Sequence, residues 1–218
     1  MSDTERKPRV LVFIVAYNAE KTIEGVLRRI PVELNDRYDT EVLIIDDSSQ
    51  DQTFERSRAF KSAGALPFAL HVLFNPVNQG YGGNQKIGFH FAIERDFDFV
   101  ALLHGDGQYA PECLPDLIAP LAVDEADAVF GSRMMTRGEA LKGGMPFYKY
   151  VGNTILSRFQ NIVLGSNLSE FHSGYRMYSV NALRRIPFHL NTNDFHFDAE
   201  IIIQLLLAKQ RIKELAIP

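Results

Sequence analysis

Three short apolar segments constrain the fold of this chain most strongly, because each ends abruptly in polar residues. They cover residues 10–15, 42–45 and 97–103. β-branched and aromatic residues dominate them, and short, nearly continuous apolar runs are typical of strands buried on both faces. Weaker segments of the same kind lie at 70–74 and 126–130, and residues 212–217 predict a final strand.

Helical patterns lie between these segments. Apolar residues at helical spacing predict helices over 23–30, 85–95 and around 201–206. Strands alternating with helices predict an α/β fold with a mostly parallel sheet flanked by helices. We find no repeat or linker, so we expect a single domain over residues 1–218. The chain stops at Pro218, directly after a strand pattern, so we expect a truncated C-terminus or a short native tail.

The amino-acid composition limits which partners and cellular locations are compatible with this chain. The net charge of −4 disfavours nucleic acid as the main partner. The single cysteine, Cys113, excludes an intramolecular disulfide and fits a reducing cytoplasm. No apolar run reaches about 18 residues, and residues 1–9 lack the apolar core of a signal peptide. We therefore expect a cytoplasmic protein without a transmembrane helix.

Residues 133–164 depart from the strand–helix alternation, because they are rich in Met, Gly, Lys and aromatic residues. They predict a loop followed by an amphipathic helix over 148–164. Such a segment can form a lid or a surface in peripheral contact with the inner face of a membrane. The alternative is a helix packed on the sheet.

The third apolar segment ends in His104-Gly105-Asp106-Gly107-Gln108. A parallel strand delivers the residue at its end to the carboxyl edge of the sheet, where ligands bind. The carboxylate of Asp106 and the amide oxygen of Gln108 suit an oxygen-coordinated ion such as Mg²⁺ or Mn²⁺. The alternative is an Asp-Gly turn after a strand.

Residues 46–53 follow the second apolar segment and carry three carboxylates and three hydroxyls. These groups can accept hydrogen bonds from a nucleobase and from ribose hydroxyls. The alternative is a helix N-cap, with Asp51 or Ser49 capping a helix that begins near Thr53. Both can hold, with Asp47 on the ligand and Asp51 on the cap.

Residues 78–84 form a glycine-rich segment before a helix, and its backbone N–H groups can bind a phosphate or sugar. It lacks the G-x-G-x-x-G spacing of dinucleotide-binding enzymes, and the chain has no G-K-[ST] phosphate loop. These absences disfavour dehydrogenases and NTPases.

Two arginines and one carboxylate are further candidates. Arg133 and Arg176 can bind a diphosphate or a phosphorylated acceptor, because a guanidinium forks onto such oxygens, although a lone arginine is usually a surface residue. Asp198 opens the last predicted helix. It is a candidate general base or acceptor-binding carboxylate, with Glu200 behind it, or alternatively a helix cap.

Taken in order, these motifs resemble glycosyltransferase family 2, and most closely its bacterial branch similar to dolichol-phosphate mannose synthases. The correspondence covers nearly the whole chain. The motifs are Val15-Ala16-Tyr17-Asn18, Asp46-Asp47-Ser48 with Asp51 and Thr53, residues 78–83, Gly131-Ser132-Arg133 and Ser173-Gly174-Tyr175-Arg176.

The resemblance implies a GT-A fold and a metal-dependent, inverting hexosyltransferase that uses a UDP- or GDP-linked sugar. The acceptor would be a polyprenyl phosphate or a glycan hydroxyl of a cell-envelope polysaccharide. No oligomeric state follows from it. By analogy with the family, Tyr17 packs on the nucleobase, Asp47 reads it, and Asp106 with Gln108 hold Mg²⁺ or Mn²⁺ against the diphosphate. We expect the donor-binding residues to be Tyr17, Asn18, Asp46, Asp47, Asn78, Gly80, Gly82 and Asp106. His104 is a further candidate metal ligand, and our candidate catalytic residues are Asp198, Arg176 and Arg133.

The chain departs from the family pattern at three positions. His104 stands where the family usually has Asp, and it would bind Mn²⁺, bind donor phosphate when protonated, or only fill space. Glu170 and His172 stand where dolichol-type enzymes often carry Asp and Thr, which leaves the acceptor open. Two other functions remain: a non-catalytic nucleotide-sugar-binding member, or a sugar-1-phosphate nucleotidyltransferase. The latter would carry a Gly- and Arg-rich first loop, which residues 17–20 are not.

Overall fold

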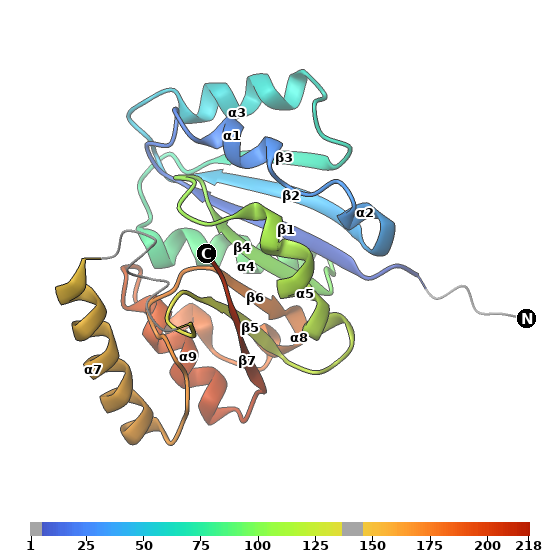
Figure 1. The fold of residues 1–218 in the computed structure, drawn as a ribbon. Coiled ribbons are helices and arrows are strands. Elements are labelled where there is room, and N and C mark those ends of the chain that lie inside the picture. Colours follow the sequence, from blue (N-terminus) through green and yellow to red (C-terminus); the bar gives the residue numbers. More distant parts are fainter. Residues whose placement is uncertain (1–5, 137–145) are drawn as a thin grey trace, which may run out of the picture.

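The computed structural model describes residues 6–136 and 146–218, and their backbone is built around one sheet (Figure 1). Within these residues the sheet has seven strands in the order β3-β2-β1-β4-β6-β5-β7. The strands are β1 (Arg9–Ala16), β2 (Asp39–Asp46), β3 (Ala69–Phe74), β4 (Phe99–His104), β5 (Ala128–Ser132), β6 (Arg176–Ser179) and β7 (Ile212–Ala216). All neighbours pair in parallel except the two pairs that involve β6. The predicted α/β fold with a mostly parallel sheet is confirmed.

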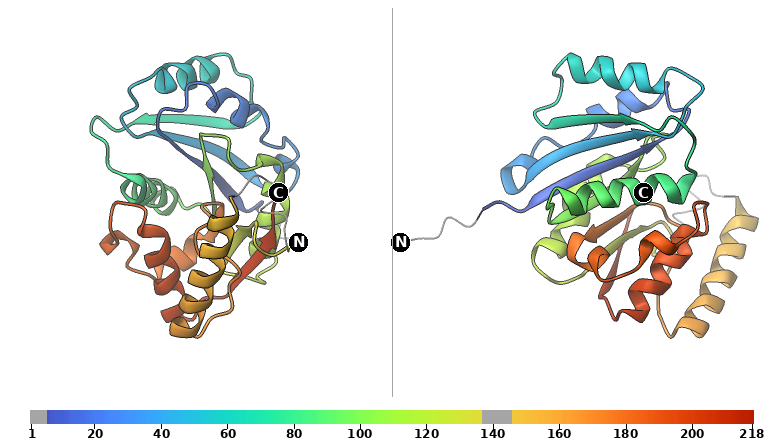
Figure 2. Two further views of the ribbon diagram at one scale, coloured as in Figure 1. Left: turned by 60° about the vertical axis from the view of Figure 1, so that its left-hand side comes forward. Right: turned by 180° about the vertical axis from the view of Figure 1, so that it is seen from behind.

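Helices cover both faces of the sheet (Figures 1 and 2). One face carries α1 (Ile23–Arg28), α2 (Leu34–Arg37), α3 (Thr53–Ser62) and α5 (Leu114–Ala122). The other carries α4 (Tyr81–Glu94), α8 (Val180–Arg184) and α9 (Phe197–Leu207). Side chains of β1 alternate between two cores, with Val12 and Ile14 in the first and Leu11 and Phe13 in the second. This alternation is why the strand has an apolar residue at nearly every position.

The strand register aligns the ends of the central strands. Ala16 pairs with Asp46, and Val15 pairs with His104, so β1, β2 and β4 end together at the carboxyl edge. The antiparallel strand β6 begins at this edge, where Arg176 pairs with Leu102. Segments far apart in the sequence therefore meet at one side of the sheet.

The structure differs from the sequence prediction in several elements. Strand β6 was not predicted, because its four residues are too few to carry a pattern and the first is a buried arginine. Helix α4 starts at Tyr81, inside the glycine-rich segment, rather than at residue 85. Helix α5 was also not predicted, since Pro115 lies in its first turn and Pro120 lies inside it.

Helix α7 (Phe147–Leu164) confirms the helix predicted over 148–164. It lies beside α9 on the outside of the molecule, away from the sheet (Figures 1 and 2). The alternative of a helix packed on the sheet is therefore wrong. Short 3₁₀ turns occupy Pro111–Cys113 and Phe188–Leu190. The loop predicted before α7 falls partly outside the described residues.

Candidate active site

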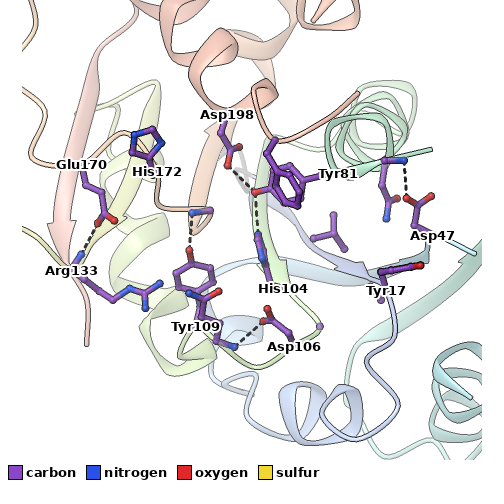
Figure 3. Close-up of a pocket in the computed structure, with 18 of the residues that line it drawn as sticks. Tyr17, Asp47, Tyr81, His104, Asp106, Tyr109, Arg133, Glu170, His172 and Asp198 are labelled. Atoms are coloured by element: carbon purple, nitrogen blue, oxygen red, sulfur yellow. Dashed lines mark hydrogen bonds between the residues drawn. The ribbon is translucent and has the colours of Figure 1, made fainter. Parts of the chain in front are cut away.

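A cavity of about 910 Å³ opens at the carboxyl edge of the sheet (Figure 3). This volume is large enough for a nucleotide-sized ligand. The structure brings nine of the predicted residues to its wall: Tyr17, Asp47, Asn78, Gly80, His104, Asp106, Gln108, Arg133 and Asp198. Asn18, Asp46, Gly82 and Arg176 do not line it.

Asp106 is exposed to the cavity just past the end of β4. Its Oδ1 accepts a hydrogen bond from the backbone N–H of Gln108 at 2.9 Å. Oδ2 has no hydrogen-bond donor among the described residues, so it is available to a cation. The Gln108 side chain is also exposed to the same space.

The donor set around Asp106 fits an open divalent-cation site. Among the described residues, no group of three or more His, Cys, Asp or Glu side chains converges on one point. Mg²⁺ and Mn²⁺ are commonly held by one or two carboxylates together with phosphate oxygens and water. Asp106 and Gln108 offer hard oxygen ligands of this kind and leave positions for a ligand's phosphates.

His104 is enclosed by aromatic side chains. Its ring lies edge-on to Tyr81 and to Tyr109, with centroid distances of 5.7 and 5.2 Å, and its Nε2 is 3.5 Å from the Tyr81 hydroxyl. A Cβ at Gly174 would lie 2.7 Å from Nε2, so glycine is required there. Burial lowers the pKa of His104, although Asp106 and Asp198 oppose this. The neutral imidazole is favoured, which disfavours the phosphate-binding role that needs a protonated ring.

Asp198 is nearly buried and is held by two partners. Its Oδ2 accepts a hydrogen bond from the Tyr81 hydroxyl at 2.8 Å (Figure 3). Its Oδ1 lies 3.3 Å from Nη1 of Arg176. Burial and the Asp198 carboxylate raise the pKa of Tyr81 well above its ordinary value, so Tyr81 remains the donor. Asp198 is thus fixed as a carboxylate at the wall of the cavity.

Arg176 is not placed to bind a phosphate, which corrects the sequence prediction. It is 1% exposed and donates to three backbone carbonyls: Nε to Ser173 at 2.7 Å, Nη1 to Asp198 at 2.8 Å and Nη2 to Phe171 at 2.9 Å. Burial alone would lower its pKa, but the adjacent Asp198 carboxylate raises it. Arg176 therefore positions Asp198 and the 171–176 segment.

Arg133, in contrast, faces the cavity. Its guanidinium lies over the ring of Tyr109, 5.0 Å from the centroid, and its backbone N–H donates to Glu170 Oε2 at 3.1 Å. Its Nε is buried and has no hydrogen-bond partner in the part of the chain that the structure describes. An unpartnered buried donor of this kind is costly, and an anionic ligand would satisfy it.

The two aspartates after β2 have different positions. Asp46 is fully buried, and its Oδ1 accepts a hydrogen bond from Ser49 N at 2.8 Å, while burial raises its pKa. The prediction that Asp46 contacts the donor is corrected, since it holds the 46–49 turn instead. Asp47 does face the cavity. Its carboxylate also accepts hydrogen bonds from the Asn75 side chain, from Gln79 N at 2.8 Å and from Gly80 N at 3.0 Å.

Several N–H groups of the glycine-rich segment are already bound within the protein, which leaves fewer for a phosphate than the sequence predicted. The N–H groups of Gln79 and Gly80 are bound by Asp47, and that of Gly82 donates to the Asn193 carbonyl at 2.8 Å. Gly80 has φ +80°, and a Cβ there would lie 2.4 Å from the Asn193 oxygen. The glycines permit close packing against residues 192–197.

The two polar residues that follow β1, Tyr17 and Asn18, also have different positions. Tyr17 is 53% exposed at the cavity. Asn18 points away, to the neighbouring turn, where its Oδ1 accepts from Gln50 N at 2.8 Å and its N–H donates to Ser49 Oγ. The predicted contact of Asn18 with a donor is therefore not made by its side chain.

Sequence reasoning missed three aromatic residues of the wall, namely Tyr81, Tyr109 and Phe195. Tyr81 stacks on Phe195 with a centroid distance of 5.0 Å, and Tyr109 accepts a hydrogen bond from Gly174 N at 2.8 Å. Their only signal in the sequence was their place next to polar motifs. Glu170 and His172, noted as departures from the family pattern, also line the cavity.

Comparison with known proteins identifies relatives across almost the whole chain. The family model described as "Glycosyl transferase family 2" matches residues 11–186. An undecaprenyl-phosphate mannosyltransferase of Micrococcus luteus is 30% identical over 96% of this chain and 82% of its own. A UDP-N-acetylglucosamine–dolichyl-phosphate N-acetylglucosaminyltransferase of Methanococcus voltae is 28% identical over 95% of this chain and 84% of its own.

Solved structures support the same fold. Glucosyl-3-phosphoglycerate synthase from Mycobacterium tuberculosis, in complex with Mn²⁺, UDP and phosphoglyceric acid, aligns with a TM-score of 0.69 and 19% identity. The alignment covers 96% of this chain and 68% of that one. The predicted GT-A fold is thereby confirmed. No helix in the described residues is long and apolar enough to cross a membrane.

Proposed function

Because the chain belongs to glycosyltransferase family 2, we propose that it transfers a sugar from a nucleoside diphosphate sugar to a polyprenyl phosphate, with inversion at the anomeric carbon. The observation that most directly supports this proposal is that Asp106, Arg133 and Asp198 face one cavity. Among the residues that the structure describes, one carboxylate is available to a cation, one guanidinium has an unpartnered nitrogen, and one carboxylate is held in place. We assign the whole chain to one catalytic domain.

The donor half of the site is formed by the ends of β1, β2 and β4. Tyr17 offers an exposed ring on which a nucleobase can stack, and Asp47 lies beside it with its carboxylate at the cavity wall. We propose UDP rather than GDP, in keeping with the UDP bound by the mycobacterial synthase.

A divalent ion would be held by Asp106 with Gln108, and His104 is the further candidate from the sequence. When bound, the ion neutralises negative charge that develops on the leaving diphosphate. The His104 ring packs edge-on against Tyr81, whose hydroxyl donates to Asp198.

The acceptor half is formed by Arg133 and Asp198. A polyprenyl phosphate arrives ionised and needs no base, so Arg133 is proposed to hold it through charge-assisted hydrogen bonds. This acceptor would place the reaction at the inner face of a membrane, and the Micrococcus and Methanococcus relatives both carry a lipid phosphate in their names.

A glycan hydroxyl is the second candidate acceptor, and the placement of Asp198 favours it specifically. Asp198 lines the cavity, its Oδ2 accepts a hydrogen bond from Tyr81, and its buried Oδ1 lies beside Arg176. The Asp198 carboxylate would therefore be the group that takes a proton from a hydroxyl nucleophile.

The test is a turnover assay with Mn²⁺, a panel of UDP- and GDP-linked sugars, and undecaprenyl phosphate in detergent. We expect nucleoside diphosphate release coupled to a labelled lipid product, with the β or α configuration opposite to that of the donor. Asp106→Asn should abolish both, and Asp36→Asn, an exposed carboxylate on α2, should not. Donor turnover only with a hydroxyl acceptor would support the second candidate, and no turnover with any donor would favour the non-catalytic member.

A further inference from the structure

Helix α7 presents an apolar face to solvent. Its exposed apolar side chains are Phe147, Tyr148, Val151, Ile155, Leu156, Phe159, Ile162 and Val163. Their exposed fractions range from 38% at Val151 to 82% at Ile162. A contiguous apolar surface of this size is unusual on a protein that functions alone in water, and it marks an interaction site.

The amphipathicity of α7 is inverted relative to a helix that covers a core. The side that faces the body is mostly polar: Ser157 is buried, and Asn153 lines the cavity. Asn161 donates to the Leu168 carbonyl at 2.8 Å and accepts from Leu168 N at 2.9 Å. Leu164, at the end of the helix, packs against the second core. Mainly polar groups attach the helix to the body, so packing among the described residues does not explain its apolar side.

The helix is also positively charged and adjoins the cavity. It contains Lys149 and Arg158 and no Asp or Glu. Pro146, directly before it, lines the cavity together with Asn153. Helix α7 therefore adjoins the cavity that Arg133 also lines.

We propose that this face of α7 docks on the surface of an anionic lipid bilayer and so brings the mouth of the cavity to the lipid phosphate. The inference rests on the proposed lipid-linked acceptor. An amphipathic helix with aromatic and aliphatic residues on one side and cations beside them inserts its apolar side at the boundary of head groups and acyl chains. The absence of acidic residues matches an anionic surface.

A second copy of this chain fits the face less well than lipid does. Packing the α7 faces of two copies would bring two positively charged helices together, and like charges repel. A bilayer accepts the apolar side chains and supplies the opposite charge.

The experiment is co-sedimentation of the whole chain with vesicles of phosphatidylcholine and phosphatidylglycerol, compared with vesicles of phosphatidylcholine alone. We expect binding to the anionic vesicles. Replacing two exposed side chains, Phe159→Ser with Ile162→Ser, should lower the partition coefficient by roughly a hundredfold. The matched control, Val32→Ser with Val123→Ser, removes two exposed side chains away from the cavity and should bind as the parent does.

Charge is tested separately with Arg158→Gln, which should weaken binding to anionic vesicles by about fivefold, since one cation near such a surface contributes about 1 kcal/mol. Equal binding of the parent and the Phe159/Ile162 variant to both kinds of vesicle would overturn the proposal. So would a dimer in sedimentation equilibrium that these two substitutions dissociate, in the absence of vesicle binding.

Two further readouts separate this inference from the proposed function. With a short, water-soluble prenyl phosphate, the Phe159/Ile162 variant should turn over as the parent does. With the acceptor embedded in vesicles, its rate should fall with its vesicle binding. Vesicle binding without any turnover would contradict the proposed function and leave the docking surface standing.

Discussion

Arg176 and Arg133 have the same side chain in opposite surroundings. Arg176 is enclosed by three carbonyls and the Asp198 carboxylate, whereas one nitrogen of Arg133 has no hydrogen-bond partner within residues 6–136 and 146–218. At the level of sequence both looked like phosphate ligands. Their difference arises from the antiparallel β6, which buries its first residue.

Substitutions should distinguish the structural role of Arg176 from the ligand-binding role of Arg133. Arg176→Gln leaves a buried carboxylate and backbone carbonyls without a cation, so we expect a loss of about 3–5 kcal/mol in the free energy of unfolding. Arg133→Gln should leave stability within about 0.5 kcal/mol and raise the KM for a phosphorylated acceptor. Urea unfolding and steady-state kinetics measure the two effects. A stable Arg176→Gln protein with only a raised KM would restore the original prediction.

Tyr81 acts on the reaction through Asp198. Tyr81→Phe removes the hydroxyl that donates to Asp198 Oδ2 at 2.8 Å. Hydrogen bonds to a charged group contribute about 1.5–3 kcal/mol. With a hydroxyl acceptor, for which Asp198 is the proposed base, we therefore expect turnover to fall by roughly tenfold or more while nucleotide affinity is unchanged. The control is Tyr38→Phe, which removes the hydroxyl of a tyrosine in the first core that does not line the cavity. Unchanged turnover in Tyr81→Phe, measured against this control, would show that Asp198 is held by Arg176 alone.

Two histidines of the cavity predict a pH dependence of stability. Partial removal from water lowers the pKa of His104, and also that of the more exposed His172, below the ordinary value of 6.5. The unfolded chain therefore binds more protons than the folded one just below this pH, and the free energy of unfolding decreases as pH falls through it. Each group contributes a slope of at most about 1.4 kcal/mol per pH unit. In urea titrations His104→Asn should flatten the slope, and His189→Asn, at an exposed site, should keep it. Equal slopes in the parent and His104→Asn would remove His104 from this role.

At the scale of elements, the N-terminus of α4 depends on close backbone contact. A Cβ at Gly80 would meet the Asn193 oxygen at 2.4 Å, and φ there is +80°. Gly80→Ala should therefore destabilise the protein by about 2 kcal/mol or more. A Cβ at Gly25, within α1, would have no other atom within 4 Å, so Gly25→Ala should raise stability by about 0.5–1 kcal/mol. Thermal unfolding of both variants checks the contrast, and a loss at Gly80 no greater than the change at Gly25 would contradict it.

Elements with strong periodicity were predictable from the sequence, and elements fixed by distant contacts were not. Strand β1 has apolar residues on both of its faces, so its position could be predicted from the sequence alone. Strand β6 exists because Arg176 can reach carbonyls in two other segments, and no local pattern carries that information. The same holds within the site. The edge position of Asp106 followed from the strand before it, whereas the engagement of the 78–84 amides by Asp47 and Asn193 depends on tertiary packing.

At the scale of the whole molecule, nucleotide binding should be visible as a gain in stability. A ligand at a hundredfold excess over its Kd stabilises the folded state by about 2.7 kcal/mol. We expect UDP with Mn²⁺ to raise the melting temperature more than GDP does, and Asp47→Ala and Asp106→Asn to reduce the shift. A thermal-shift screen with and without the metal measures this. No shift with any nucleotide, in a well-folded sample, would contradict a nucleotide-sugar donor.

The insertion of β6 between β4 and β5 also sets an order for assembly during synthesis. All strands that pair with β1, β2 and β3 are synthesised before residue 105. In contrast, β4 and β5 are joined only through β6, which is synthesised about seventy residues after β4. At typical elongation rates that interval is on the order of ten seconds. Throughout it, the nascent chain exposes an unpaired edge of β4, which is the kind of edge that chaperones and neighbouring chains can pair with.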